Sequence, residues 1–286
     1  MLDLVMRFGI LLFMVGSLGG VGLRVMPRDV LRPLKHTRFL VVSLVTCWIL
    51  CPLVAVLILK VIPLAQPYAA GLLLLSLAPC APFAPAMVRI ARGDGSYLAA
   101  FMVLSAITTV ILMPIGVPLL LDGVQVDPWR IARPLLMYVL IPLLVGLTIS
   151  ATRPRAAAWL RPKLEKVTAA AALAMFVPIV HLFGPGIIEA IGSHAIAAQA
   201  IYLIVTTGIT HALGSALRDD QRSVLTLGIC TRNLGAALAP ISAVAADERG
   251  VVMIAIGAIS TLFWSAIIAR RLGRVVAQPA APGLEV

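Results

Sequence analysis

The chain has 286 residues, of which 61% are hydrophobic and only 12% are charged, and its mean hydropathy is +1.05. These values exclude an ordinary water-soluble domain and predict an integral membrane protein. The formal net charge of +11 would suit a nucleic-acid-binding protein. However, the basic residues gather in alternate connections between apolar stretches, so they indicate topology and argue against nucleic acid as a partner.

Nine apolar stretches are long enough to cross a lipid bilayer as helices, because about 20 residues span a ~30 Å hydrocarbon core. Each is a continuous apolar run, which favours α-helices over barrel strands. They lie near residues 4–23, 39–62, 68–90, 97–121, 131–151, 167–190, 195–217, 223–246 and 250–269. We therefore expect an all-α membrane protein with a single membrane domain at residues 1–274 and a disordered cytoplasmic tail at 275–286.

The basic residues predict the orientation of these spans. Most of them lie in the connections at 24–38, 89–94, 152–166 and 218–222 and in the tail at 270–274. Basic connections stay on the cytoplasmic side of a membrane. The pattern therefore predicts a multi-pass protein of the cell inner (plasma) membrane, with a cytoplasmic C-terminus and, given nine spans, an external N-terminus.

The third span carries prolines at three-residue spacing, Pro79, Pro82 and Pro85. A proline inside a helix removes a backbone donor and clashes with the preceding turn, at a cost of about 3 kcal/mol. Because three of them cannot share one regular helix, we predict an unwound segment near residues 79–85, halfway through the membrane. By contrast, the second and fifth spans each carry a single proline near mid-span, Pro52 and Pro142.

Three spans and one connection carry further candidate features. The fourth span places Ser105, Thr108 and Thr109 on an apolar run, and such hydroxyls either bond to their own helix carbonyls or line a site. The basic stretch TRPRAAAWLRPKLEK after the fifth span is expected to be a loop that links two halves of the chain. His211 in the seventh span is either an interhelical hydrogen bonder or a site residue.

The eighth span, RSVLTLGICTRNLGAALAPISAVA, carries Arg232 and Asn233 near its centre. An arginine at mid-membrane is unfavourable by about 2.5 to 3.5 kcal/mol, so such residues usually face protein or a water-filled cavity. Gly228, Gly235 and Pro240 flank the pair and make a break in the helix easy. We expect a second broken helix here, with a transport site at the break.

The third and eighth spans lie five spans apart. A segment repeated after an odd number of crossings points the opposite way, so the two broken spans indicate an inverted-topology repeat. In such repeats the paired broken helices cross near the midplane and form the site.

The motifs, taken together, resemble the bile acid:sodium symporter family from about Phe8 to Arg271. They are the first-helix glycines followed by PRDVLRPLKHTR, the stretch LAPCAPFAPAMVRIARGDGSYLA, the proline of ILMPIGVPLLL, and GICTRNLGAALA. The resemblance implies a panel domain and a core domain, with two discontinuous helices crossing in the core. Spans one, five and six would form the panel, and spans two, three, four, seven, eight and nine the core.

The resemblance also allows a comparison of the residues that hold sodium in the family. Where sodium-coupled members carry Ser-Asn in the first of the two crossing helices, which we call the first crossover, this chain has Ala84 and Pro85. Where they carry Glu and then Gln-Asn in the second, it has Gly228, Arg232 and Asn233. Sodium prefers oxygen ligands, and no Asp or Glu lies in the middle of any predicted span. This comparison disfavours sodium as the coupling ion.

Two roles for Arg232 follow. Its guanidinium either supplies the positive charge that sodium ions would otherwise bring beside an anionic substrate, or it ties the crossover to carbonyls that the prolines set free, a task for which its five donors are suited. In both cases the residue belongs to the crossover.

The predicted function is secondary transport of a small or amphipathic organic anion by alternating access. The candidate substrate-binding residues are Arg232, Asn233, Thr231, Pro79, Pro82, Pro85 and His211. The candidate ion-binding residues are Asn233, Ser105, Thr108 and Thr109. A membrane-embedded sensor or accessory protein with a transporter-like fold is the alternative.

We expect neither catalysis nor a metal or cofactor. Membrane transferases of this size need paired acids to hold magnesium, and the only adjacent acids here, Asp219-Asp220 and Asp247-Glu248, lie in short connections. All four cysteines fall inside predicted spans, without a metal-ligand spacing, and are expected to behave as small apolar residues.

Overall fold

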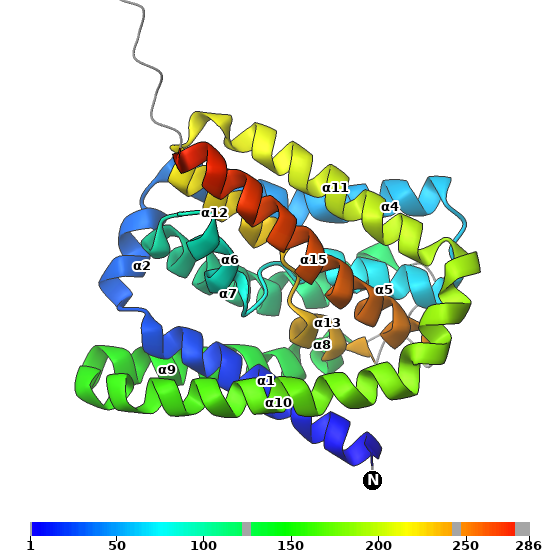
Figure 1. Ribbon diagram of the computed structural model, residues 1–286, viewed down its shortest axis with the longest axis horizontal. Coiled ribbons are helices and arrows are strands. Elements are labelled where there is room, and N and C mark those ends of the chain that lie inside the picture. The colour runs from blue at the N-terminus through cyan, green and yellow to red at the C-terminus, as the bar shows by residue number, and fades with distance from the viewer. Residues whose placement is uncertain (1, 122–126, 242–246, 278–286) are drawn as a thin grey trace, which may run out of the picture.

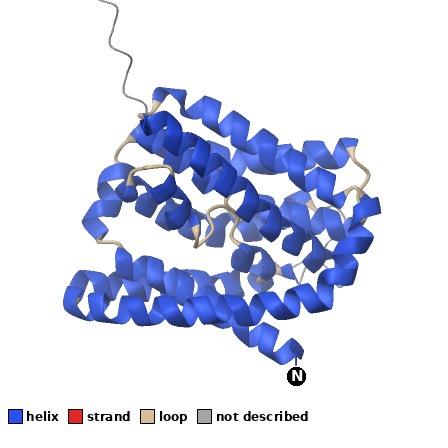
Figure 2. Ribbon diagram, viewed as in Figure 1, coloured by secondary structure: helices blue, strands red, loops and turns tan. Residues whose placement is uncertain are grey.

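The computed structural model describes residues 2–121, 127–241 and 247–277, and these residues are almost entirely helical (Figure 2). Within them the only β-type pairing is one isolated bridge, between Pro79 and Arg232. Five helical segments are long and apolar enough to cross a membrane: Thr37–Val61, Gly95–Leu120, Pro128–Thr152, Ala195–Ala216 and Arg249–Arg274. The prediction of an all-helical chain with the composition of a membrane protein is therefore confirmed.

One layer of the molecule consists of α1 (Leu2–Arg24), α9 (Ile141–Thr152) and α10 (Pro154–Glu189), which lie along the lower edge of Figure 1. α1 packs extensively on both partners. A Cβ atom on Gly22 would lie 2.7 Å from the backbone nitrogen of Leu147, so glycine is what lets α1 and α9 approach this closely.

Two of the membrane-length segments widen into a π-helical turn just before a proline. The first runs through α3 (Thr37–Val45), η1 (Thr46–Leu50) and α4 (Cys51–Val61), and the second through α8 (Pro128–Leu135), η2 (Leu136–Leu140) and α9. Pro52 and Pro142 cannot donate a backbone hydrogen bond, and a π-turn accommodates that missing bond without ending the helix. The helices therefore continue past Pro52 and Pro142, and each predicted interruption is only a widened turn.

Most of the remaining helices form a second layer above α1, α9 and α10 in Figure 1. They include α7 (Gly95–Leu120), α11 (Ala195–Leu213) and α15 (Arg249–Ala277). The third predicted span is divided into α5 (Gln66–Ser76) and α6 (Ala84–Ile90), and the eighth into α12 (Asp219–Cys230) and α13 (Leu234–Leu238). Short connecting turns are η3 (Ala190–Ser193) and η4 (Gly214–Ala216).

Both predicted breaks are confirmed, with small shifts in their bounds. The first unwound segment covers residues 77–83 rather than 79–85, because Pro85 lies in the first turn of α6. A proline is tolerated there since the first backbone N–H groups of a helix have no internal partner. The second break covers residues 231–233. Residues 242–246, the end of the predicted eighth span, lie outside the described residues.

The predicted loop at 152–166 is wrong. α10 begins at Pro154 and runs for 36 residues, so most of this stretch is helical and continuous with the next span. Alanine-rich sequence, a proline in the first turn and side-chain pairs one turn apart favour the helix. One pair is Arg161 with Glu165 at 2.9 Å, and another places the Lys163 ammonium 3.1 Å from the centre of the Trp159 ring.

Helix also extends into the other terminal and connecting regions. α2 (Pro27–Leu34) lies within the basic connection after the first span, which was predicted as a loop. At the C-terminus, α15 continues to Ala277. Residues 278–286, most of the predicted disordered tail, lie outside the described residues.

Candidate functional site

The two unwound segments pair with each other in antiparallel fashion. The backbone nitrogen of Cys80 donates to the carbonyl of Thr231 at 2.9 Å, and that of Asn233 donates to the carbonyl of Ala78 at 2.8 Å. These bonds flank the bridge between Pro79 and Arg232. Backbone groups that leave a helix inside a membrane must find partners in protein or in a cavity, and here each broken helix supplies partners for the other.

Arg232 is completely buried, and its side chain makes three contacts within the second layer. Nη1 donates to the carbonyl of Ser76 at 3.4 Å, Nη2 donates to Sγ of Cys51 at 3.0 Å, and the guanidinium carbon lies 5.1 Å from the centre of the Tyr202 ring. In a continuous helix the Ser76 carbonyl would accept from Cys80, whose N–H pairs with Thr231 instead. Arg232 therefore holds a carbonyl that the break sets free.

A small cavity of about 10 Å³ lies at the crossing of the broken helices. Its lining brings together five of the predicted site residues with side chains of α1 and η2: Pro79, Pro82, Ser105, Thr109 and Asn233, beside Leu18 and Val139. That volume suffices for about one water molecule. In this conformation the crossing is therefore closed to an organic ligand.

Two polar residues of this cavity are partly engaged in structural bonds. The amide oxygen of Asn233 accepts from the backbone nitrogen of Ala236 at 3.2 Å and so caps α13. The hydroxyl of Ser105 donates to the carbonyl of Met102 at 3.0 Å. The amide NH₂ of Asn233 and the lone pairs of the Ser105 hydroxyl oxygen are the groups that this geometry leaves for a ligand.

Two other predicted residues have hydroxyls used in packing. Thr108 donates to the carbonyl of Leu104 at 2.7 Å and accepts from Nε1 of Trp48 at 3.1 Å. Thr231 donates to the carbonyl of Leu227 at 2.8 Å. Neither lines the small cavity.

The structure does not bring His211 to the crossing. Its Nδ1 lies 3.2 Å from the hydroxyl of Thr226, and its carbonyl accepts from Nε of Arg222 at 2.8 Å. These contacts join the end of α11 to the middle of α12. The geometry matches the interhelical bonding role that the sequence left open for this residue.

Two larger cavities lie between the layers, on either side of α1. One of about 480 Å³ is lined by α1, α6 and the start of α7, and it includes Pro85, Arg89 and Asp94. The other, of about 530 Å³, is lined by α1, α10, α13 and α15, together with Pro82 and Phe83 from the first break. Both fall in the size range of small-molecule sites, about 300 to 1,000 Å³.

Sequence reasoning missed Arg24, which lines both large cavities. It lies at the end of the first span and was grouped with the basic connection that follows. Nε and Nη2 of Arg24 donate to the Glu165 carboxylate at 3.2 and 2.8 Å, and Arg161 shares that carboxylate. The i,i+4 spacing of Arg161 and Glu165 was visible in the sequence, but their meeting with Arg24 depends on how α1 packs on α10.

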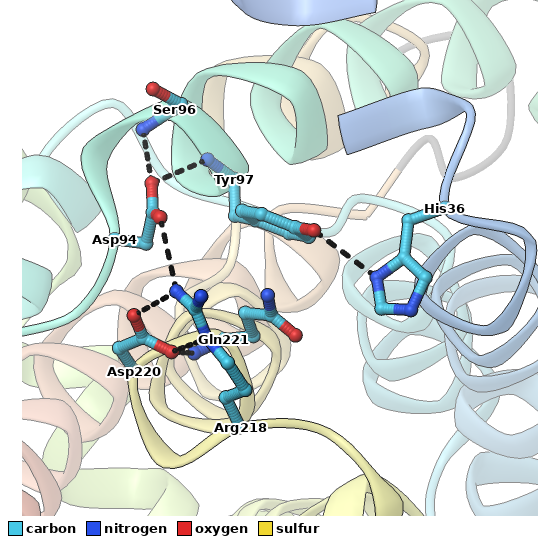
Figure 3. A network of polar contacts seen from close by, with 7 residues as sticks. All are labelled: His36, Asp94, Ser96, Tyr97, Arg218, Asp220 and Gln221. Atoms are coloured by element: carbon cyan, nitrogen blue, oxygen red, sulfur yellow. Dashed lines mark hydrogen bonds and ion pairs between the residues drawn. The ribbon is translucent and has the colours of Figure 1, made fainter. Parts of the chain in front are cut away.

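A polar network connects the helix ends at the basic side of the second layer (Figure 3). The Asp94 carboxylate caps α7 by accepting from the backbone nitrogen of Ser96 at 2.7 Å, and it lies 3.8 Å from Nη2 of Arg218. Arg218 also pairs with Asp220, and the hydroxyl of Tyr97 lies 3.1 Å from Nδ1 of His36. The network therefore ties the starts of α7 and α12 together, and it engages one of the adjacent acids considered above.

No curated protein matches the chain. The sequence profile described as the Sodium Bile acid symporter family matches residues 9–190, which include most of α1, the first broken helix, α9 and α10. This match covers more than half of the chain and confirms the resemblance carried by the motifs. The chain belongs to the sodium bile acid symporter family, whose members are transporters.

Proposed function

We propose that this protein is a secondary transporter that moves a small or amphipathic organic anion across the cell inner membrane by alternating access. The observation that carries the proposal is the antiparallel pairing of Pro79 with Arg232 where two broken helices cross. Irregular backbone at membrane depth is tolerated where it lines a cavity or contacts protein, and paired broken helices are typical of transporter sites.

The proposed membrane arrangement has nine spans. Five are the long apolar segments, two are α1 and α10, and two are the broken pairs α5–α6 and α12–α13. We assign α1, α8–α9 and α10 to the panel and the other spans to the core. The broken pairs lie five spans apart, which supports an inverted repeat in residues 1–274.

The basic side is proposed to be cytoplasmic. Figure 1 places α2, the turn between α9 and α10, and the C-terminal end of α15 on the left side of the molecule. The basic connections predicted from the sequence lie at these ends, and retention of such connections in the cytoplasm places the N-terminus outside.

The charge of Arg232 supports a mechanism without sodium coupling. No carboxylate contacts its guanidinium among the described residues, so its positive charge is not neutralised locally by an acid. At an effective dielectric constant of 20, a sodium ion about 6 Å away would be repelled by roughly 3 kcal/mol. An anion at the crossing would be attracted by a similar amount, so the site favours an anionic substrate.

The two large cavities support an organic substrate. Both lie between the panel and the core, where a rigid movement of one against the other would open one side and close the other. The 10 Å³ cavity at the crossing is too small for such a substrate in this conformation, so transport requires this movement.

The test is thermal unfolding of the detergent-purified protein with a panel of carboxylated, sulfated and steroid-like anions, followed by uptake of each stabilising anion into proteoliposomes. A ligand that binds only the folded state raises the unfolding midpoint. We expect at least one anion to do so and to be taken up. If no anion stabilises the protein and none is transported, the proposed function is wrong.

A further inference from the structure

The guanidinium of Arg232 points away from the small cavity at the crossing. Arg232 and Asn233 follow each other in the unwound segment that pairs with the first break. Successive side chains of such an extended segment point to opposite sides. Asn233 lines the cavity, whereas Arg232 does not line it and reaches Cys51 on α4 and Tyr202 on α11 instead. The charge of Arg232 therefore lies inside the second layer, where α4 and α11 pack on each other (Figure 1).

No opposite charge lies beside Arg232 in the part of the chain that the structure describes. Its contacts are the Ser76 carbonyl, the Cys51 sulfur and the Tyr202 ring, and no ion pair of the described residues includes it. A charge that is completely buried is costly unless it is paired, because the interior screens it weakly. The geometry therefore calls for a counter-ion.

Three buried side chains in this region carry polar atoms that have no hydrogen-bond partner among the described residues. These atoms are Nε of Arg232, the hydroxyl of Tyr202 and both amide atoms of Gln199, and all three residues are completely buried. Gln199 lies three positions before Tyr202 on α11, so the two side chains share one face of that helix. Three of the four atoms belong to donor groups. The group therefore lacks an acceptor and carries a positive charge.

We propose that a monatomic anion, chloride, binds inside the second layer among Arg232, Tyr202 and Gln199 as the counter-ion of the guanidinium. Chloride supplies both the missing acceptor and the missing negative charge, whereas a water molecule supplies only the acceptor. The ion has to be small, because all three side chains are completely buried.

This inference goes beyond the proposed transport function, since a chloride ion held here needs no transported substrate. The two proposals share one positive charge. An organic anion at the crossing and chloride inside the second layer would both be attracted by Arg232 and would repel each other. Binding of either anion should therefore weaken binding of the other.

The test measures chloride binding to the full protein in detergent, with sodium gluconate as the chloride-free reference. Sodium chloride replaces the gluconate stepwise at constant ionic strength. We expect the unfolding midpoint to rise with chloride, because a ligand that binds only the folded state stabilises it. Radioactive chloride should bind saturably, with one ion per protein. Bromide should replace chloride, whereas sulfate, which is larger and doubly charged, should not.

Variants locate the ion. Gln199→Leu and Tyr202→Phe each remove an unpartnered polar group and keep a side chain of similar shape. Each should weaken chloride binding about tenfold, because one hydrogen bond to a charged group is lost. Gln221→Leu is the control for the glutamine, since Gln221 is also buried with an unpartnered amide oxygen but lies at the start of α12, away from the break. Tyr68→Phe is the control for the tyrosine, because Tyr68 is buried near the start of α5.

The charge itself is tested by Arg232→Gln, which should abolish chloride binding. Unfolding midpoints in gluconate show which variants fold. If Arg232→Gln does not fold, Gln199→Leu and Tyr202→Phe still decide the question, because neither removes the guanidinium or its contacts with Ser76 and Cys51.

The outcomes separate this proposal from the transport function. Equal midpoints in chloride and in gluconate, without saturable chloride binding, would mean that water fills the site and would overturn the proposal. Chloride stabilisation that Gln199→Leu and Tyr202→Phe leave unchanged would place the ion elsewhere and would also overturn it. In both cases uptake of an organic anion would still support transport. Chloride binding that both variants weaken, in a protein that transports no organic anion, would support the site and contradict the transport function.

Discussion

The guanidinium of Arg232 donates to the sulfur of Cys51 across 3.0 Å, and both residues are completely buried. Cys51 begins α4 just after the π-turn, so the widened helix and the second break meet at this contact. A buried charge needs partners for its donors. Ser76 and Cys51 accept from the two terminal nitrogens of Arg232 and Tyr202 presents its ring, whereas the buried Nε has no hydrogen-bond partner among the described residues. This arrangement permits both roles predicted for Arg232, because the same guanidinium donates to a freed carbonyl and supplies a positive charge.

Two substitutions separate these roles. Arg232→Lys keeps the charge but loses the planar fork, and Arg232→Gln loses both. We expect each to lower the free energy of unfolding by about 1 to 3 kcal/mol, because a freed carbonyl loses its donor. Anion uptake should persist partly in Arg232→Lys and vanish in Arg232→Gln. A glutamine variant that transports like the wild type would contradict the charge role. A lysine variant as stable as the wild type would contradict the structural role, in which Arg232 donates to the freed carbonyl.

The partners of Arg232 can be tested one at a time. Cys51→Ala leaves a buried donor unpaired and should destabilise the protein by about 1 to 3 kcal/mol. Cys47→Ala is the matched control, because Cys47 is a buried thiol one turn earlier with no hydrogen bond to Arg232 among the described residues. Equal loss of stability in both variants, measured by thermal unfolding, would show that the Cys51 thiol contributes packing only.

Tyr202 offers a separate test of the cation–π contact. The ring centre lies 5.1 Å from the guanidinium carbon, within the ~6 Å range of such interactions. Tyr202→Phe keeps the ring and should change stability little, whereas Tyr202→Leu should cost about 2 kcal/mol in a desolvated site. If both variants unfold at the same temperature, the ring face does not hold the charge.

The breaks in both helices were predictable because their causes are local. Three closely spaced prolines and a mid-span arginine each disfavour a continuous helix whatever surrounds them. The same reasoning predicted that the freed backbone groups would need partners, but it did not predict that Pro79 would pair with Arg232. Which carbonyl Arg232 would hold was not predictable, since Ser76 lies 156 positions away and the contact depends on tertiary packing.

The errors also have physical causes. The stretch at 152–166 is polar, and hydropathy alone cannot distinguish a polar helix from a loop. Arg24 was overlooked because its importance comes from Glu165, 141 positions away on a helix that packs against α1. For His211 the sequence left two roles open, and the choice depends on tertiary packing, which directs its ring toward Thr226.

Stabilisation of the protein by an anion is expected not to depend on sodium. Asn233, Ser105 and Thr109 meet at the crossing, but Arg232 lies in the same backbone bridge as Pro79. We expect a stabilising anion to raise the unfolding midpoint equally in sodium chloride and in potassium chloride at the same ionic strength, because no carboxylate of the described residues contacts the bridge to attract sodium. A midpoint shift that requires sodium would contradict the hypothesis that Arg232 supplies the positive charge in place of sodium. Asn233, Ser105 and Thr109 would then be the candidate sodium ligands.

The contact between α1 and α9 gives a matched pair of glycine variants. Gly22→Ala places a methyl group 2.7 Å from the backbone nitrogen of Leu147, whereas Gly20→Ala on the same helix meets no atom within 4 Å. We expect Gly22→Ala to destabilise the protein by about 1 to 3 kcal/mol through overpacking. Gly20→Ala should leave stability unchanged or raise it by up to about 1 kcal/mol. Equal midpoints in thermal unfolding would mean that α1 and α9 can separate without loss.

The triad of Arg24, Arg161 and Glu165 predicts a pH dependence of stability. Glu165 lies before the predicted span at 167–190. The hydrogen bond from Arg161 lowers the pKa of Glu165 below its ordinary value, partial burial opposes the shift, and Arg24 adds to it. A carboxyl whose pKa is lowered by folding stabilises the protein above its unfolded pKa of about 4.3, and that stability is lost as the pH falls through the folded value.

Glu165→Gln should therefore lower the free energy of unfolding at pH 7 by about 0.2 to 1 kcal/mol, because the side chain is 39% exposed and solvent screens the pair. The difference from wild type should shrink as the pH is lowered below about 4. Glu189→Gln removes the same charge near the other end of α10 and is the control, since Glu189 is exposed there. If the Glu165 effect is the same at pH 7 and at low pH, the carboxylate acts through packing and not through its charge.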